Sequence, residues 1–215
     1  MVFGKIEYLN LLPFHVFMKR YTKSSQQSMS MHYYRGVPAN INKKFSSKKV
    51  DAGFISSIKA KKHSHVNLGI VAKKEVLSVL VIPDTQQKKD EESASSNVLA
   101  NILNIQGEVL IGDKALKHYI QKKPFIDLAH EWNKRYQLPF VFAVLCYHKD
   151  KKLYSNIEKE FLKRKVKIPS YILHQASCRT DIPNKEILNY LTYISYQLDT
   201  KAYLGLKKFY NKVRF

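Results

Sequence analysis

The chain has 215 residues, 45% of them hydrophobic and 25% charged, a composition that is typical of a globular protein and excludes a disordered one. This length suffices for one large domain or two small ones, each able to bury a core without disulfide bonds. The two cysteines have no CxxC spacing, which excludes a thiolate metal cluster and indicates a reducing compartment.

The charge balance is strongly basic, with 37 Lys and Arg against 17 Asp and Glu, and a net charge of +20. Such a balance would suit a nucleic-acid partner, because basic patches release counterions from phosphates. However, residues 81–144 carry no net charge, and Lys predominates over Arg, whereas base and phosphate recognition favours the planar Arg side chain. We therefore expect no nucleic-acid partner, and we expect the excess charge to attract small anions.

The N-terminal stretch does not read as an export signal, because Lys5 and Glu7 interrupt its apolar residues and no small-residue cleavage site follows. No run of about 18 uncharged apolar residues occurs that could span a membrane. We expect a cytoplasmic protein without a membrane partner. The sequence does not indicate the oligomeric state.

Short β-branched or aromatic runs predict seven strands, at 2–8, 29–34, 51–55, 67–72, 75–82, 108–112 and 139–147. Helical patterns separate most of them, and Pro13 and Pro38 stand at favoured first-turn positions of two predicted helices. This alternation predicts an α/β fold with a parallel sheet. The C-terminal third is expected to be entirely helical, with amphipathic helices at 150–165, 170–178, 185–198 and 200–212.

Two segments are candidate crossing points between lobes. The polar, turn-rich segment 83–93 follows an apolar strand, and the apolar segment 138–147 leads back into charged helices. We therefore expect two α/β lobes with a cleft between them. Residues 1–82 and 145–215 would form a discontinuous first lobe, and residues 83–144 an inserted second lobe.

Two polar residues stand where a ligand is expected. Asn10 ends the first predicted strand, and open α/β sheets bind ligands at the carboxyl ends of their strands. The alternative is a turn or helix cap, for which Asn is also suited. Ser78 lies inside an apolar strand, where a hydroxyl facing the core would need a partner, so we expect it to face the cleft.

Two serine pairs are candidate anion-binding groups. Ser56 and Ser57 follow a predicted strand, and Ser95 and Ser96 open a predicted helix. Backbone N–H groups at the start of a helix, with hydroxyls beside them, can hold a carboxylate. Ordinary helix capping is the alternative for both pairs, and both roles can be true together.

The remaining candidates are expected to be mainly structural. Asp113 would most simply cap the helix that follows it, with substrate binding as a second role, and Asp127 is expected to be a cap. Trp132, Phe140 and Phe142 are expected to pack in the core. The eight His show no metal-ligand spacing, so no metal site is predicted, and no Ser-His-Asp or Cys-His arrangement can be argued.

Six blocks in the same order resemble the chorismate dehydratases of the futalosine route to menaquinone, the MqnA family. They are GKIEYLNLLPF at 4–14, GVP at 36–38, VDAGFISS at 50–57, VLSV at 76–79, ESASS at 92–96, and VLIGDKAL at 109–116 together with 127–144. The chain is shorter than the family norm between Ser78 and Ser93, and Lys74-Glu75 replaces the usual Gly-Pro turn. These departures affect loops and leave the strand-end residues in place.

The resemblance implies an α/β, two-lobed, type-2 periplasmic-binding-protein-like fold with a central cleft. It also implies a cofactor-free lyase that converts chorismate to 3-[(1-carboxyvinyl)oxy]benzoate and water. Asn10 would be catalytic, through an amide that bonds a reacting oxygen, and a substrate carboxylate is the favoured base. The substrate-binding residues would be Ser56, Ser57, Ser78, Ser95, Ser96 and Asp113.

Two alternatives remain open. The same fold holds small anions without chemistry in solute receptors and regulator domains, and a test with chorismate would separate that class from an enzyme. The sister enzyme that makes 1,4-dihydroxy-6-naphthoate shares the fold, but its first strand ends in a Pro-Asn-Asp-type pattern that Tyr8-Leu9-Asn10 does not reproduce.

Overall fold

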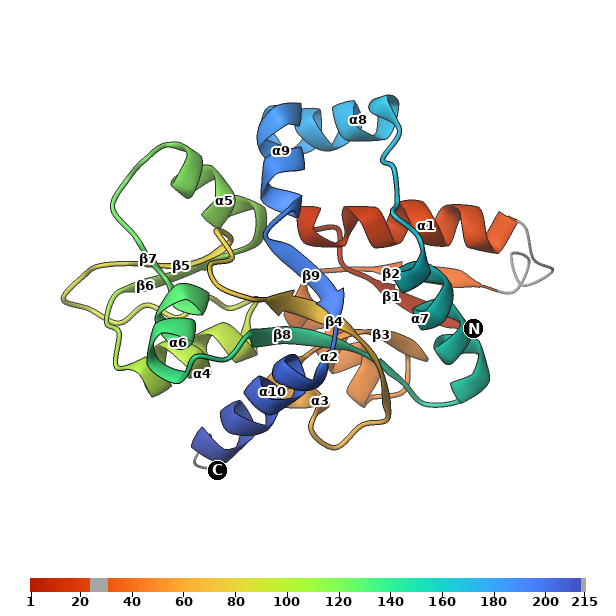
Figure 1. The fold of residues 1–215 in the computed structure, drawn as a ribbon, viewed down its shortest axis with the longest axis horizontal. Helices are drawn as coiled ribbons and strands as arrows, with labels where there is room; N and C mark the ends of the chain where they lie inside the picture. The colour runs from red at the N-terminus through yellow and green to blue at the C-terminus, as the bar shows by residue number, and fades with distance from the viewer. Residues whose placement is uncertain (24–30, 214–215) are drawn as a thin grey trace.

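In the computed structural model, residues 1–23 and 31–213 are described, and they form two β-sheets with helices packed around them (Figure 1). The larger sheet has the strand order β2-β1-β3-β8-β4-β9. Its strands are β1 (Val2–Lys5), β2 (His32–Arg35), β3 (Ala52–Ser56), β4 (His65–Ala72), β8 (Phe140–Tyr147) and β9 (Ile194–Gln197). The smaller sheet has the order β6-β5-β7, with β5 (Val79–Ile82), β6 (Glu108–Ile111) and β7 (Ile126–Asp127).

The helices follow the strands in the predicted rhythm over the first two thirds of the chain. The described helices are η1 (Leu9–Leu11), α1 (Leu12–Lys23), α2 (Pro38–Ser46), α3 (Ser57–Ala60), α4 (Ala94–Leu103), α5 (Gly112–Ile120), α6 (Leu128–Tyr136), α7 (Lys151–Lys163), α8 (Ser170–Thr180), α9 (Asn184–Leu191) and α10 (Thr200–Lys212). Pro38 is the first residue of α2, as predicted, because its fixed φ suits a helix start.

The larger sheet is mixed, whereas the sequence predicts a parallel sheet. β1 pairs in parallel with β2 and β3, but β8 runs antiparallel to both β3 and β4. The smaller sheet is antiparallel throughout its described pairs. The prediction of a strand at 29–34 is confirmed only from His32, and residues 29 and 30 lie outside the described part.

The prediction of an entirely helical C-terminal third is wrong. Helix α9 ends at Leu191, and residues 194–197 form β9, which pairs antiparallel with β4. The pairing joins Ile194 to Ala72 and Ser195 to Val71. The edge of β4 would otherwise leave backbone N–H and C=O groups unpaired, and β9 satisfies them.

The predicted strand at 75–82 also begins later than expected, at Val79. Leu77 has a φ of 61°, in the left-handed region, so the chain turns sharply before the strand starts. The N–H groups of Val76 and Leu77 both bind Asp127 Oδ2, at 2.9 and 2.7 Å. This buried carboxylate fixes the turn that replaces the first residues of the predicted strand.

Strand pairing bears on the predicted limits of the lobes. β5 lies within residues 1–82, which were expected to belong to the first lobe, but it pairs with β6 and β7 in the smaller sheet. Most of β8 lies within residues 83–144, which were expected to form the second lobe, but β8 belongs to the larger sheet. We propose that the chain crosses between lobes at residues 73–78 and 137–139.

Aromatic side chains fill the cores beside both ends of the larger sheet. Phe14 contacts Phe54 and Phe161 with ring centroids 5.0 and 5.3 Å apart. Trp132 and Phe140, both predicted to be core residues, are fully buried with centroids 5.2 Å apart. No helix among the described residues is long and apolar enough to cross a membrane.

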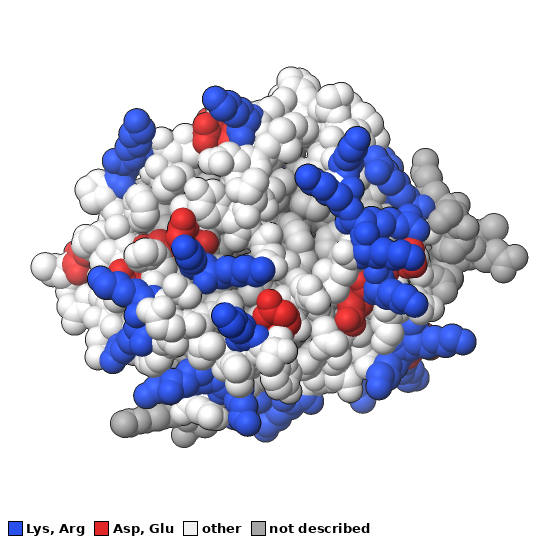
Figure 2. All heavy atoms as spheres, in the orientation of Figure 1, with Lys and Arg blue, Asp and Glu red and all other residues white. Residues whose placement is uncertain are grey.

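The charged side chains on the face drawn in Figure 2 lie mostly around the rim of a central hollow. Lys and Arg side chains predominate on this rim and gather most densely on its right-hand side, in the region where Figure 1 shows α1, β2 and α7.

Candidate functional site

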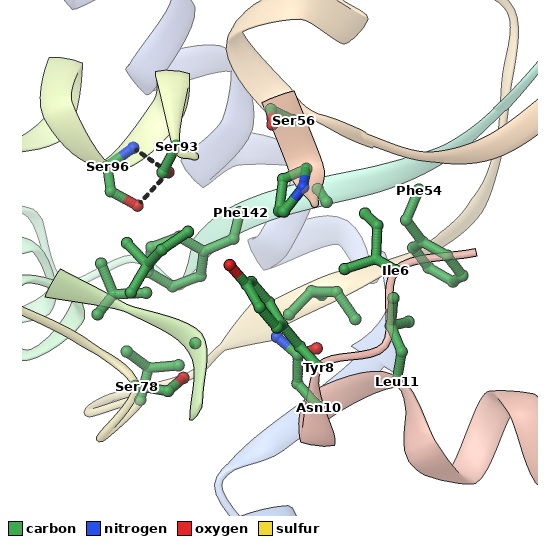
Figure 3. Close-up of a pocket in the computed structure, with 17 residues that line it drawn as sticks. Ile6, Tyr8, Asn10, Leu11, Phe54, Ser56, Ser78, Ser93, Ser96 and Phe142 are labelled. Atoms are coloured by element: carbon green, nitrogen blue, oxygen red, sulfur yellow. Dashed lines mark hydrogen bonds between the residues drawn. The ribbon is translucent and has the colours of Figure 1, made fainter. Parts of the chain in front are cut away.

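A pocket of about 60 Å³ lies between the two sheets (Figure 3). Residues of the larger sheet and its loops form one wall: Ile6, Tyr8, Asn10, Leu11, Pro38, Phe54, Ser56, Ile70, Phe142 and Ala143. Residues of the smaller sheet and its helices form the other: Val76, Ser78, Val79, Ser93, Ser96, Ile111 and Gly112. Four of the seven predicted site residues therefore line one pocket, namely Asn10, Ser56, Ser78 and Ser96.

Asn10 lies within η1, because β1 ends at Lys5 rather than at Asn10 as predicted. Its main chain is held firmly: Tyr196 Oη donates to the Asn10 carbonyl at 2.6 Å, and the neighbouring Leu9 N–H donates to Asp113 Oδ1 at 3.0 Å. The Asn10 side-chain oxygen Oδ1 is buried and has no hydrogen-bond partner among the described residues. It therefore caps no described helix, and it offers an unused acceptor to a ligand in the pocket.

Ser78 lines the opposite wall, on the turn that Asp127 fixes. Its Oγ accepts a 2.8 Å hydrogen bond from Tyr190 Oη, and its carbonyl accepts one from Gly112 N–H at 2.8 Å. Burial raises the pKa of Tyr190, so the phenol stays protonated and acts as the donor. This contact leaves the Ser78 hydroxyl hydrogen free to point toward another acceptor.

Ser96 lines the pocket at the start of α4. Its backbone N–H donates to Ser93 Oγ at 3.2 Å, and the two hydroxyls are 2.7 Å apart. Ser93 caps the helix and also lines the pocket, although the sequence analysis did not select it. The Ser-x-x-Ser spacing before an apolar helix is the local signal that could have identified this cap.

Ser56 reaches the pocket from the end of β3. Asn42, on α2, holds it on two sides: Asn42 Nδ2 donates to Ser56 Oγ at 2.8 Å, and Ser56 N–H donates to Asn42 Oδ1 at 3.0 Å. Asn42 is not among the site residues predicted from the sequence. Its amide fixes the position of the serine hydroxyl that a ligand would meet.

Ser57 and Ser95 are not among the residues that line the pocket. Their hydroxyls contact each other at 3.1 Å, Ser57 Oγ donates to the Val141 carbonyl at 2.7 Å, and Ser95 Oγ accepts from Ile58 N–H at 3.1 Å. The structure therefore places this pair behind the pocket wall, where it ties α3 to α4 and to β8. Alternate residues of a segment point in different directions, which separates each serine from its neighbour.

Asp113 does not cap α5, and the prediction of that role is wrong. The helix cap position is Ile111, and Asp113 instead accepts hydrogen bonds from Leu9 N–H at 3.0 Å and from Arg179 Nη1 at 3.2 Å. It does not line the pocket. Asp113 therefore connects α5 and α8 to the segment that carries Asn10. Asp127, in contrast, caps α6 as predicted.

Tyr8 is the most prominent pocket residue that the sequence analysis did not select. Figure 3 shows its ring standing in the pocket in front of Asn10. Its hydroxyl donates to the Glu92 carboxylate, so the contact joins the segment after β1 to the segment before α4. Burial, together with Glu92, raises the pKa of Tyr8, so the phenol remains protonated.

Gly112 allows the Tyr8 ring to approach this wall. Gly112 has a φ of 65°, and a Cβ atom there would lie 2.7 Å from Tyr8 Cζ. We expect Gly112→Ala to displace the Tyr8 ring and to lower kcat/KM about tenfold, since small misplacements of pocket groups are costly. Steady-state kinetics will test this. Gly36→Ala is the control, because its Cβ would meet no atom closer than 3.4 Å; equal kinetics for the two variants would contradict the expectation.

His15 supports the same segment from below, with Nε2 donating to the Ile6 carbonyl at 2.7 Å. Burial lowers the pKa of His15 from 6.5 to about 4. A His that is neutral in the folded state contributes stability above pH 6.5, and this contribution is lost as the pH falls toward 4.

We therefore expect His15→Gln to reduce the difference in unfolding free energy between pH 7 and pH 5 by about 2 kcal/mol. Urea denaturation at both pH values measures this difference. The exposed His174 serves as the matched control for the substitution, and His174→Gln should leave the unfolding free energy at pH 7 unchanged. An unaltered pH dependence in His15→Gln would contradict the expectation, because His15 would then take up a proton as readily in the folded state as in the unfolded state.

Among residues 1–23 and 31–213, no three His, Cys, Asp or Glu side chains gather in an arrangement that could hold a metal ion. The absence of a metal or organic cofactor stays a prediction.

The fold is shared with proteins of known structure. Protein AF1704 from Archaeoglobus fulgidus matches with a TM-score of 0.72 over 98% of this chain and 95% of its own, at 11% identity. The alkanesulfonate-binding protein SsuA from Xanthomonas axonopodis pv. citri matches with a TM-score of 0.59 over 99% and 92%, at 10% identity. At such low identity the likeness concerns the fold alone. It defines a two-lobed α/β protein of the periplasmic-binding-protein-like class, as predicted.

The chain belongs to the menaquinone biosynthesis family, which matches residues 1–105 and 93–214. A chorismate dehydratase from Campylobacter jejuni subsp. jejuni is 44% identical over 213 residues, which cover 97% of this chain and 96% of that protein. The family predicted from the six sequence blocks is thereby confirmed.

Proposed function

We propose that this protein is a chorismate dehydratase, a hydro-lyase of menaquinone biosynthesis that acts in the cytoplasm. The observation that carries the proposal is the buried Asn10 amide, whose oxygen has no partner among the described residues, in a pocket lined by serines from both walls. The 44% identical relative named chorismate dehydratase supports the same function.

The reaction removes the ring hydroxyl of chorismate and a hydrogen from the neighbouring ring carbon, and the ring becomes aromatic. Aromatisation supplies the driving force, so the protein mainly has to hold the substrate and stabilise the charge that moves. Asn10 Oδ1 can accept a hydrogen bond from the ring hydroxyl, while the amide nitrogen can donate to an oxygen that gains negative charge.

The two substrate carboxylates need hydrogen-bond donors that keep their protons near pH 7, as serine hydroxyls do. We place one carboxylate at the start of α4, beside the Ser93 and Ser96 hydroxyls, which lie 2.7 Å apart on the pocket wall. Ser56 and Ser78 supply hydroxyls on the two walls for the rest of the molecule. Ser57, Ser95 and Asp113 would act through the residues that they hold in place.

No Asp, Glu, His, Lys or Arg is among the described residues that line this pocket. This composition favours a carboxylate of the substrate itself as the base that takes the ring hydrogen. Tyr8 is the lining residue whose side chain can ionise, but the raised pKa of its phenol keeps it protonated, so it acts as a hydrogen-bond donor rather than as a base. Apolar side chains, including Phe54, Ile70 and Phe142, keep water away from the ring.

The test is incubation of the purified protein with chorismate in the presence of a chelator, followed by chromatography and mass identification of the product. We expect chorismate to be consumed and 3-[(1-carboxyvinyl)oxy]benzoate to appear. Unchanged chorismate would refute the proposal and favour an anion-binding protein or the sister naphthoate synthase. Loss of activity with chelator, restored by a divalent metal, would refute the metal-free mechanism.

A further inference from the structure

A second, larger concavity of about 630 Å³ adjoins the pocket, and we call it the basic groove. It lies between α1, the ends of β1 and β2, and α8. Its charged lining residues are Lys5, Glu7, Lys19, Arg35 and Arg179. Tyr8 lines both the basic groove and the pocket, so its side chain forms part of the wall that separates the two.

The basic groove carries an excess of positive charge. Lys5 and Arg35 lie 3.2 and 3.4 Å from the carboxylate of Glu7, and Arg179 lies 3.2 Å from that of Asp113. Burial acts to raise the pKa of Glu7, but Lys5, Arg35 and Arg179 hold it below its usual value. With Lys19, four cations face two carboxylates, so two positive charges are uncompensated.

The pocket itself has no cationic lining residue among those described, and the Glu92 carboxylate lies at its edge beside Tyr8. A small dianion would therefore meet little attraction from the pocket walls while it is still in solvent. The basic groove supplies that attraction next to the pocket. The side chains of Arg35 and Arg179 are 68% and 46% exposed, so they are accessible to a ligand from solvent.

We infer that the basic groove is a docking site for small dicarboxylates, which bind there before they pass Tyr8 into the pocket. This inference rests on the proposed function for the identity of its natural ligand, a dicarboxylate substrate. The geometry that carries it is the shared Tyr8 wall and the two uncompensated charges. In Figure 2 the densest Lys and Arg side chains accordingly lie on one side of the central hollow.

The first experiment needs no turnover, and it titrates the protein with benzene-1,3-dicarboxylate while amide chemical shifts are recorded. We expect saturable shifts at the groove amides Thr22 and Gln175, in addition to shifts at pocket residues. The double variant Lys19→Glu/Arg35→Glu should lose the groove shifts. The control Lys201→Glu/Lys207→Glu changes the net charge equally on α10, far from the groove in Figure 1, and should retain them.

The second experiment measures chorismate turnover by the same variants at low and high salt. A cleft lined by charges of one sign raises the association rate of an oppositely charged ligand about 10- to 10³-fold. We therefore expect kcat/KM of the groove variant to fall at least tenfold at low ionic strength. The difference should disappear at high salt, and kcat should not change.

Shifts confined to the pocket, or an equal loss of kcat/KM in groove and α10 variants, would overturn the docking site. A wild-type protein that leaves chorismate intact would refute the proposed function, and the titration would still decide whether the groove binds dicarboxylates.

Discussion

Asn10→Ala is expected to lower kcat about 10²- to 10³-fold while KM changes little. One substrate carboxylate is placed beside Ser93 and Ser96 at the start of α4, and Ser56 and Ser78 supply further hydroxyls, so binding does not depend mainly on Asn10. The amide instead meets the part of the ring where charge moves. Removal of one buried donor of this kind typically costs about 10²- to 10³-fold in kcat, as oxyanion-hole deletions show.

The structure sharpens this expectation, because the Asn10 oxygen makes no hydrogen bond among the described residues. Its removal should therefore leave the melting temperature nearly unchanged, whereas loss of a helix cap would cost about 1 kcal/mol. Asn40→Ala is a matched control, since Asn40 bonds Tyr34 on the surface side of α2. Single-turnover rates and melting curves on both variants test the assignment, and a destabilised but fully active Asn10→Ala protein would refute it.

Asp127→Ala is expected to lower the free energy of unfolding more than any other single substitution in the smaller sheet. Asp127 Oδ2 accepts hydrogen bonds from Val76 and Leu77 N–H, and Oδ1 accepts them from Ala129 and His130 N–H at 2.9 and 3.0 Å. Each buried donor left without a partner costs about 1–3 kcal/mol, so we expect a loss of about 3–5 kcal/mol in unfolding free energy. The melting temperature should fall by roughly 6–20 °C.

The control is Asp199→Ala, which removes a carboxylate that caps α10 through a single 2.8 Å bond to Ala202 N–H. That change should cost about 1 kcal/mol. Because the Asp127 turn also positions Ser78, substrate affinity should fall in Asp127→Ala and not in Asp199→Ala. Equal melting temperatures in the two variants would show that the 76–77 turn is held by other contacts.

The sequence predicted those site residues whose position depends on local structure. Ser56 ends a strand and Ser96 opens a helix, and both features can be recognised from a few neighbouring residues. Asn10 was also found, although β1 ends five residues earlier and a short 3-10 helix carries the amide into the pocket. The family resemblance, rather than the pattern alone, gave Asn10 its expected role.

Contacts between residues far apart in the chain could not be predicted from the local sequence pattern. Nothing in the segment around Ser57 indicates that its hydroxyl meets Ser95, 38 positions away, behind the pocket wall. Asp113 has the spacing of a helix cap, but it binds Leu9 N–H from a distant part of the chain. Tyr8 was assigned to a strand, so its position over Asn10 could not be seen.

The missed strand β9 has a similar cause. Residues 192–196 (TYISY) are β-branched or aromatic for the most part, which is typical of a strand, but the prediction continued the amphipathic pattern of the preceding helix through them. In the structure, residues 194–197 pair with the edge of β4. The parallel-sheet prediction failed because it rested on the alternation of strands and helices alone, whereas β8 returns between β3 and β4 in the opposite direction. Tertiary pairing therefore decided both elements.

The buried Trp132 gives the protein a built-in optical reporter. It is the single tryptophan of the chain, and its indole nitrogen has no hydrogen-bond partner among the described residues. Its ring projects from α6 against β8 and α10, with Phe140 and Phe209 as neighbours. Its fluorescence should therefore be that of an indole in an apolar medium, and a red shift of the emission will follow the separation of α6 from β8 without any attached dye.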